Sequence, residues 1–221
     1  MKKVVIHTEW YLPKYDEHFA EILENGPYQL NQRRWALKFV ENYNTAIDIG
    51  SNVGFWSKPL CKKFKKVVAF EPDKDNNECF KENLKDLTNW QLEEVALSNK
   101  SGTDTLYYDG KNCGDMSMEH SYKEFKQKIE TKKLDDYVDK FEKNTVDFIK
   151  IDTQEHEYKI LEGGLNFLCN HNAVLCVEMP RRDNRENEIA KKLGKLLKRI
   201  DYQLEGVAKK ESIFKRPKKD K

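Results

Sequence analysis

A carboxylate and two glycines lie close together in residues 48–54, which read DIGSNVG. Glycine lets a backbone turn tightly and lets a ligand approach it closely. A dinucleotide fingerprint, G-x-G-x-x-G, would need a further glycine, and Asp48 would put a negative charge near the phosphates of such a ligand. The stretch therefore favours a ligand without phosphate that carries cationic groups. S-adenosylmethionine, with its sulfonium and ammonium groups, is such a ligand.

A second acidic residue, Glu71, ends the apolar run 66–70, about 20 residues beyond the glycine stretch. An acid at this spacing can accept hydrogen bonds from both hydroxyls of a ribose. The alternative is an acidic N-cap for the helix that follows. Because the run, the spacing and the glycine stretch agree, we predict that Glu71 binds a ribose.

A third stretch, 150–157, reads KIDTQEHE and supplies candidate catalytic groups. Methyl transfer to a hydroxyl requires a positioned acceptor and a base within hydrogen-bond reach. We predict Asp152 at the methyl group, orienting the acceptor or taking its proton, with His156 as the second candidate base and Glu155 as a further carboxylate. Glu157 belongs to the same group of possible bases, and its alternative role is to stabilise the start of a helix, where a negative charge suits the helix dipole. Asp152 and His156 could also join Glu178 around a divalent ion, but no spacing demands one and no metal is predicted.

Short apolar runs alternate with helical patterns along most of the chain, which predicts an α/β fold. The expected strands are 45–49, 66–70, 92–97, 146–152 and 173–178, followed by two short closing strands, 202–207 and 211–214. Strands joined by helical crossovers form a mostly parallel sheet with helices on both faces. Ligands of such sheets bind beyond the carboxyl ends of the strands, where the three stretches above lie.

The remaining segments complete the predicted organisation. Residues 1–44 carry two helical patterns and are expected to form a helical N-terminal cap on a domain that spans 45–214. Residues 98–144 read as an inserted hairpin with an irregular, acceptor-binding loop, since long loops in compact domains are often functional. Asn112 and Ser117 in this loop, with Glu178 at a strand end, are the predicted substrate-binding residues. Residues 215–221 form a basic tail.

Composition sets the class of protein. The chain has 221 residues, 38% hydrophobic and 35% charged, which suits one medium domain. No apolar run approaches the roughly 20 residues of a membrane span. The apolar stretch near the start of the chain is also shorter than the one that a signal peptide needs. The five cysteines are odd in number and form no C-x-x-C pair. We therefore expect reduced thiols and a cytoplasmic location.

The series of motifs resembles the FkbM-type methyltransferases over about residues 45–180. The matching stretches are 46–54, 68–72, 95–98, 134–135 after Thr131, and above all 147–152 running into Glu157 and 161–164. The resemblance implies a Rossmann-like class I methyltransferase fold of about seven strands, the last antiparallel. It also implies S-adenosylmethionine as donor, S-adenosylhomocysteine as product, and hydroxyls of sugars or secondary metabolites as acceptors.

Carried over by position, the family's cofactor contacts fall on defined residues. Asp48, Gly50, Asn52 and Gly54 would hold the methionine part of the donor. Glu71, followed by Pro72, would bind the ribose. Ala96 to Ser98 would border the adenine.

One position departs from the family. The usual pattern is K-I-D, two variable residues, glycine, one variable residue and glutamate, and this chain has Glu155 in place of the glycine. If the glycine adopts a backbone geometry that disfavours side chains, the loop must be reshaped here. Otherwise an extra carboxylate points near the methyl group.

The sequence thus predicts an S-adenosylmethionine-dependent O-methyltransferase that acts on a hydroxyl of a sugar, a glycan or a small glycosylated metabolite. An N-methyltransferase on nucleic acid or protein is one alternative, because residues 181–221 carry 15 Lys/Arg against 7 Asp/Glu. The Asn/Asp-Pro-Pro-aromatic signature of base methylation is absent, so nucleic acid is not expected as a partner. A non-catalytic cofactor-binding module is the other alternative, and the departure at Glu155 motivates it.

Overall fold

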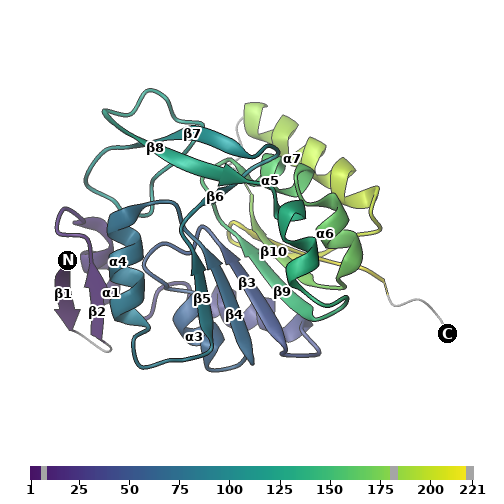
Figure 1. Cartoon of the computed structure of the whole chain (residues 1–221), viewed down its shortest axis with the longest axis horizontal. Coiled ribbons are helices and arrows are strands. Elements are labelled where there is room, and N and C mark those ends of the chain that lie inside the picture. Colours follow the sequence, from purple (N-terminus) through teal and green to yellow (C-terminus); the bar gives the residue numbers. More distant parts are fainter. Residues whose placement is uncertain (6–8, 180–183, 218–221) are drawn as a thin grey trace.

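The computed structural model describes residues 1–5, 9–179 and 184–217, and its centre is a seven-stranded sheet (Figure 1). In spatial order the strands are β11 (Gln203–Ala208), β12 (Glu211–Lys215), β10 (Val174–Glu178), β9 (Val146–Ile151), β3 (Thr45–Ile49), β4 (Lys66–Phe70) and β5 (Trp90–Glu93). Neighbours from β10 to β5 pair in parallel, whereas β12 pairs antiparallel with β10 and β11. The predicted α/β fold with an antiparallel last strand is confirmed.

Helices cover both faces of this sheet. The helices of the described chain are α1 (His18–Glu24), α2 (Leu30–Ala36), α3 (Ser57–Cys61), α4 (Lys74–Asn83), α5 (Glu157–Glu162), α6 (Leu165–Asn170) and α7 (Asn184–Lys198), with 3-10 helices at Leu37–Phe39 and Leu134–Lys140. Side chains of α1 pack in a separate cluster with the N-terminal residues Trp10 and Leu12. Side chains of α5, α6 and α7 join one hydrophobic cluster, and those of α2, α3 and α4 join another. Among the described residues, no helix has the length and apolar character needed to cross a bilayer.

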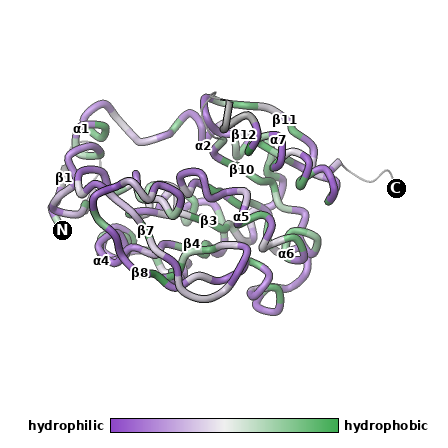
Figure 2. The backbone as a smooth tube through the Cα atoms, turned by 90° about the horizontal axis from the view of Figure 1, so that it is seen from above, coloured by the Kyte–Doolittle hydropathy of each residue, from purple (hydrophilic) through white to green (hydrophobic). Residues whose placement is uncertain are grey.

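The two clusters follow from the alternation of side chains along each strand. In β3, Ile47 and Ile49 enter the first cluster while Ala46 enters the second. Because both faces are covered, the central strands are mostly apolar, and Figure 2 shows hydrophobic residues along β4 and β10. Asp48 in β3 and Lys150 in β9 are buried exceptions, and both belong to the site described below.

A second, three-stranded sheet lies above the carboxyl ends of the main strands (Figure 1). Its order is β6 (Ala96–Leu97), β8 (Phe125–Lys132) and β7 (Gly102–Tyr108). The strand predicted at 92–97 is therefore split, since the chain leaves the main sheet after Glu93 and β6 pairs with β8 instead. The irregular stretch between β7 and β8 contains the predicted acceptor loop.

The N-terminal segment is more varied than the helical cap expected from the sequence. It begins with an antiparallel hairpin, β1 (Lys2–Val5) and β2 (Glu9–Leu12), before α1 and α2. The β-branched and aromatic residues of these strands favour extended structure over helix. At the other end, only residues 215–217 of the predicted basic tail are described, and residues 218–221 lie outside the described part.

Candidate active site

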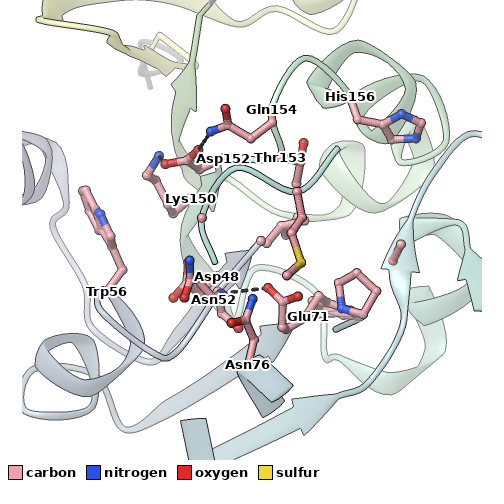
Figure 3. A pocket seen from close by; sticks show the side chains of 18 of the residues that line it. Asp48, Asn52, Trp56, Glu71, Asn76, Lys150, Asp152, Thr153, Gln154 and His156 are labelled. Atoms are coloured by element: carbon pink, nitrogen blue, oxygen red, sulfur yellow. Dashed lines mark hydrogen bonds and ion pairs between the residues drawn. The ribbon is translucent and has the colours of Figure 1, made fainter. Parts of the chain in front are cut away.

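A pocket opens at the carboxyl ends of β3, β4 and β9, beside the segment 95–97 (Figure 3). Of the residues predicted to bind the cofactor, all but two line it: Asp48, Gly50, Asn52, Glu71, Pro72 and Ala96. Gly54, which packs against Leu84 and Phe80, and Ser98 do not line it. Asp152 and His156 also line it, so the fold brings the predicted cofactor stretch and the predicted catalytic stretch to one place.

The two glycines after β3 are required by the backbone itself. Gly50 has φ +76°, and a Cβ atom there would lie 2.0 Å from the carbonyl oxygen of Asp152. Gly54 has φ +93°, and its Cβ would lie 2.6 Å from Cδ1 of Leu84. Glycine tolerates positive φ and close approach, which other residues do not. The tight turn keeps β3 against β9 and starts the segment that leads into α3.

Asp48 is a buried carboxylate at the floor of the site. Its Oδ2 accepts a hydrogen bond of 2.6 Å from the hydroxyl of Ser57. Burial raises the pKa of Asp48 to about 6, although the Ser57 hydrogen bond opposes the shift. A carboxylate that has lost most of its water interacts strongly with a cation placed nearby.

Glu71 also lies buried in the pocket, where it accepts hydrogen bonds from the backbone N–H groups of Asn52 and Asp73, both at 2.9 Å. Burial, reinforced by the Asp73 carboxylate, raises the pKa of Glu71 to about 8. The N-cap of α4 is Asp73, which accepts from the Asn76 N–H at 2.8 Å. Asp73, and not Glu71, is therefore the residue that caps α4. The Glu71 carboxylate can still accept hydrogen bonds from a ligand in the pocket.

Two further polar atoms of the pocket suit a polar ligand. The Ser51 hydroxyl and Oδ1 of Asn76 are buried and have no hydrogen-bond partner among the described residues. Buried polar groups are normally paired, so such atoms mark where a ligand or water completes the site. The facing wall is apolar and includes Phe70, Val95 and Leu97, which suits a flat ring. These residues fit a nucleoside with polar substituents.

The end of β9 carries an ion pair that sequence reasoning missed. Nζ of Lys150, which is fully buried, lies 3.0 Å from Oδ2 of Asp152 and 5.3 Å from the centre of the Trp56 ring. Burial alone would lower the pKa of Lys150, but the charge of Asp152 raises it above its ordinary value. A lysine within the apolar run of a buried strand was the available signal, because such a charge needs a partner.

His156 is held at one edge of the pocket, away from the other labelled side chains (Figure 3). Its Nδ1 lies 2.6 Å from Oε1 of Glu119, its Nε2 lies 3.0 Å from the Ser98 hydroxyl, and the residue is 2% exposed. The hydrogen bond to His156 lowers the pKa of Glu119 to about 2 although burial opposes it. Both ring nitrogens of this candidate base therefore have partners, and Ser98 contacts His156 rather than lining the pocket.

The loop after β9 keeps a left-handed backbone at the position of the family glycine. Glu155 has φ +78°, and the preceding Gln154 has φ +54°. Such conformations of non-glycine residues cost about 1–3 kcal/mol each. The Glu155 carboxylate lies 3.2 Å from Nε2 of His120 and faces a neighbouring groove rather than the cofactor pocket. The loop is thus not reshaped to avoid positive φ, and its extra carboxylate points away from the pocket.

This groove adjoins the cofactor pocket and has a volume of about 600 Å³, within the range of ligand sites. Phe19, Tyr28, Gly114 and Gln154 line both cavities. Among the predicted substrate-binding residues, Asn112 and Glu178 line the groove.

Ser117, the third predicted substrate-binding residue, is buried, and its hydroxyl donates to the carbonyl oxygen of Gln154 at 2.7 Å. It anchors the loop. Glu157 lines the groove and accepts a hydrogen bond of 2.8 Å from the Thr153 N–H. In the described part of the chain, no three His, Cys, Asp or Glu side chains are grouped as metal ligands.

The sheet order, the glycine turn after β3 and the acid after β4 define a Rossmann-like methyltransferase domain. A family model described as a methyltransferase FkbM domain matches residues 48–204. The chain belongs to the FkbM methyltransferase family, and its cofactor is S-adenosylmethionine. No curated protein sequence matches the chain.

Solved structures are similar at low sequence identity, which shows the fold. Methyltransferase FkbM from Methylobacillus flagellatus KT aligns with a TM-score of 0.57 and 16% identity, over 87% of this chain and 51% of that protein. This chain thus spans about half the length of that protein. A precorrin 8w decarboxylase of Methanobacterium thermoautotrophicum aligns with a TM-score of 0.52 and 13% identity, over 86% of this chain and 91% of that protein. SMU.1697c of Streptococcus mutans, a putative methyltransferase in complex with SAH, aligns with a TM-score of 0.50 and 13% identity, over 85% of this chain and 95% of that protein.

Proposed function

We propose that this methyltransferase acts on a hydroxyl group of a sugar, a glycan or a small glycosylated metabolite. The observation that carries the proposal is the position of Gln154, which lines both the cofactor pocket and the groove. A molecule bound in the groove therefore reaches the cofactor beside Asp152. S-adenosylmethionine, when bound, supplies an electrophilic methyl group, and the chain must place a hydroxyl against it.

Several side chains support cofactor binding in the orientation that this reaction needs. Asp48 offers a buried carboxylate to the cationic methionine part, and Glu71 offers its acceptor oxygens to the ribose hydroxyls. The apolar wall at Ala96 and Leu97 suits the adenine. With these contacts, the methyl group would face the end of β9, where Asp152 lies.

The groove has the chemistry of a site for hydroxyl-rich ligands. Glu155 and Glu178 provide carboxylate acceptors, and Asn112 and Gln154 provide amides that both donate and accept. The ring of Tyr28 adds an apolar surface. A sugar presents hydroxyls and apolar C–H faces together, so this mixture favours a carbohydrate acceptor over a purely apolar one.

The charge of the groove does not favour a polyanion. Lys209 and Lys210 at one end are balanced by Asp115, Glu155 and Glu178. Nucleic-acid sites neutralise many phosphates with Lys and Arg and lack such carboxylates. N-methylation of a nucleic acid is therefore the weaker candidate, and a non-catalytic module would have no need of an acceptor groove that opens onto the cofactor.

A cytoplasmic location belongs to the same proposal. All five cysteines are free: Cys61, Cys79, Cys113, Cys169 and Cys176. Four of them are buried, and free thiols are typical of proteins in a reducing compartment.

The test is methyl transfer from labelled S-adenosylmethionine to a panel of monosaccharides, oligosaccharides, glycosylated metabolites, amines and oligonucleotides. We expect an O-methyl product, identified by mass spectrometry and by the position of the new methyl resonance. A Glu71→Ala variant, which should lose the donor, controls for contaminating activity. Transfer only to amino groups, or no transfer by a protein that binds the donor, would overturn the proposal.

A further inference from the structure

Two carboxyl side chains meet where the cofactor pocket opens into the groove. Asp152 follows β9 and lines the pocket, while Glu178 ends the neighbouring strand β10 and lines the groove. The side-chain amide of Gln154 donates to both, at 3.4 Å to Oδ1 of Asp152 and 3.2 Å to Oε2 of Glu178. An acceptor hydroxyl that passes from the groove to the cofactor would enter between these groups.

Asp152 and Glu178 form ion pairs with different lysines. Lys150, which is buried, lies 3.0 Å from Asp152, whereas Lys210, whose side chain is 43% exposed, lies 2.9 Å from Oε1 of Glu178. The fully buried Lys150 acts on Asp152 with little solvent screening and keeps it ionised, whereas solvent screens the half-exposed ammonium of Lys210, which only partly offsets the burial of Glu178. Glu211 of β12, paired with Glu178 across the sheet, is a third carboxyl beside them.

These surroundings separate the pKa values of the pair. Burial, followed by the charge of Asp152, raises the pKa of Glu178, while Lys150 and Lys210 oppose this shift. Burial would also raise the pKa of Asp152, but Lys150 holds it below its usual range. Asp48, Glu157 and Glu211 are further carboxyls that interact electrostatically with Asp152. Tyr28 and Cys176 stay protonated because burial raises the pKa of each. The pair therefore behaves as one weak and one strong base, as neighbouring carboxyls often do.

The other candidate bases are engaged elsewhere. Both ring nitrogens of His156 are occupied by Glu119 and Ser98, so the ring can take no proton from an acceptor without breaking a contact. Glu155 lines the groove, where its carboxylate lies 3.2 Å from Nε2 of His120.

We propose that Glu178 is the general base of the reaction and that Asp152 orients the acceptor hydroxyl. This rests on the proposed function. The acceptor oxygen forms a bond to the donor's methyl carbon as the carbon–sulfur bond breaks, and the electron pair of that bond goes to sulfur. The hydroxyl proton goes to a carboxylate oxygen of Glu178 and leaves later to water. A carboxyl with a raised pKa performs this step better than Asp152, because base strength follows pKa.

The test compares wild type with Glu178→Gln, which keeps the size and hydrogen bonding of the side chain but cannot take the proton. We expect kcat to fall by about 100-fold or more, the usual contribution of a general base. The KM for the acceptor should change only a few-fold, and the affinity for S-adenosylhomocysteine should not change. The rising limb of the pH–kcat profile should disappear in Glu178→Gln and persist in Glu178→Asp. Glu205→Gln, an exposed change on β11, is the matched control.

The outcomes separate this inference from the proposed function. Wild type could methylate a hydroxyl while Glu178→Gln keeps both its kcat and the rising limb of its pH–kcat profile. The base would then be another group, and the proposed function would stand. A rise in KM alone would make Glu178 a substrate-binding residue and would also overturn the inference. If wild type binds S-adenosylhomocysteine but methylates no hydroxyl, the proposed function fails first, and the base role fails with it.

Discussion

Three carboxyls around the cofactor pocket have different partners, and these partners decide how each will respond to a ligand. Asp48 accepts from the Ser57 hydroxyl, and Asp152 pairs with the Lys150 ammonium. Glu71 is stabilised by neutral N–H donors, and hydrogen bonding to these donors opposes the effect of its burial. Its charge is therefore the one most dependent on what binds in the pocket.

The first prediction concerns the pH dependence of cofactor binding. The pKa of Glu71 is raised to about 8, and hydroxyl donors from a ribose favour its ionised form. Affinity for S-adenosylhomocysteine should therefore be full above this pKa and weaken as the pH falls through it, by at most tenfold per unit. Calorimetric titrations from about pH 9 to about pH 7 in wild type and Glu71→Gln measure the effect. Equal pH dependence in both proteins would contradict the assignment.

A second residue-scale prediction concerns the strain at Glu155, whose φ is +78°. Glutamate in this conformation destabilises the folded protein by about 1–3 kcal/mol. Glycine removes this strain but makes the unfolded chain more flexible, which lowers stability by about 0.4–1 kcal/mol. Glu155→Gly should therefore raise the free energy of unfolding by about 1 kcal/mol. Glu155→Ala keeps a side chain at the strained position and should give no gain. Urea unfolding at an unchanged m-value measures both, and a glycine variant less stable than the alanine variant would contradict the strain.

At the scale of elements, the turn after β3 depends on Gly50. A Cβ atom there would lie 2.0 Å from the backbone oxygen of Asp152, and the turn has positive φ. Gly50→Ala should destabilise the protein by at least about 3 kcal/mol and abolish cofactor binding, because β3 and β9 must separate. Gly194→Ala in α7 meets no atom within 4 Å and should instead stabilise by about 0.5–1 kcal/mol. Thermal unfolding of the two variants should therefore move in opposite directions.

A buried carboxylate helps to hold the acceptor loop to the N-terminal segment, beside the hydrogen bond of 3.0 Å from the Glu17 N–H to the Lys111 carbonyl oxygen. Asp16 accepts from the Phe19 N–H and the Cys113 N–H, both at 2.9 Å. Asp16→Ala should cost about 1–3 kcal/mol and speed hydrogen exchange of residues 109–118, because a buried donor loses its acceptor. Asp16→Asn keeps one acceptor oxygen and should have a smaller effect. Unchanged exchange in Asp16→Ala would mean that other contacts hold the loop.

The elements were predictable where their patterns are local. Alternation of apolar runs with helical spacing predicted the parallel strands, and the family resemblance predicted the antiparallel last strand, which is β12. The run 92–97 was predicted as one strand, because apolar residues alone do not say which partner strand each half will find. The hairpin β1–β2 was missed for a similar reason, since its pairing depends on chain that folds back on itself.

At the scale of the whole molecule, the sequence predicted which segments would meet but not how their side chains would pair. The glycine stretch, Glu71 and Asp152 all lie in the pocket region, because parallel strands bring their carboxyl ends to one edge. The contacts of His156 with Glu119 and Ser98 join residues 37 and 58 positions apart. No local pattern carries such pairings, so the roles of His156 and Lys150 needed the folded chain.

Calorimetric titration of S-adenosylhomocysteine into wild type, Asp48→Ala and Glu71→Ala tests the central claim most directly, namely that this pocket holds the cofactor. We predict saturable, one-to-one binding to wild type and its loss in both variants, while all three proteins unfold cooperatively. Glu205→Gln should bind as wild type does, because its side chain is exposed on β11. A wild type that does not bind, or variants that bind equally well, would contradict the account.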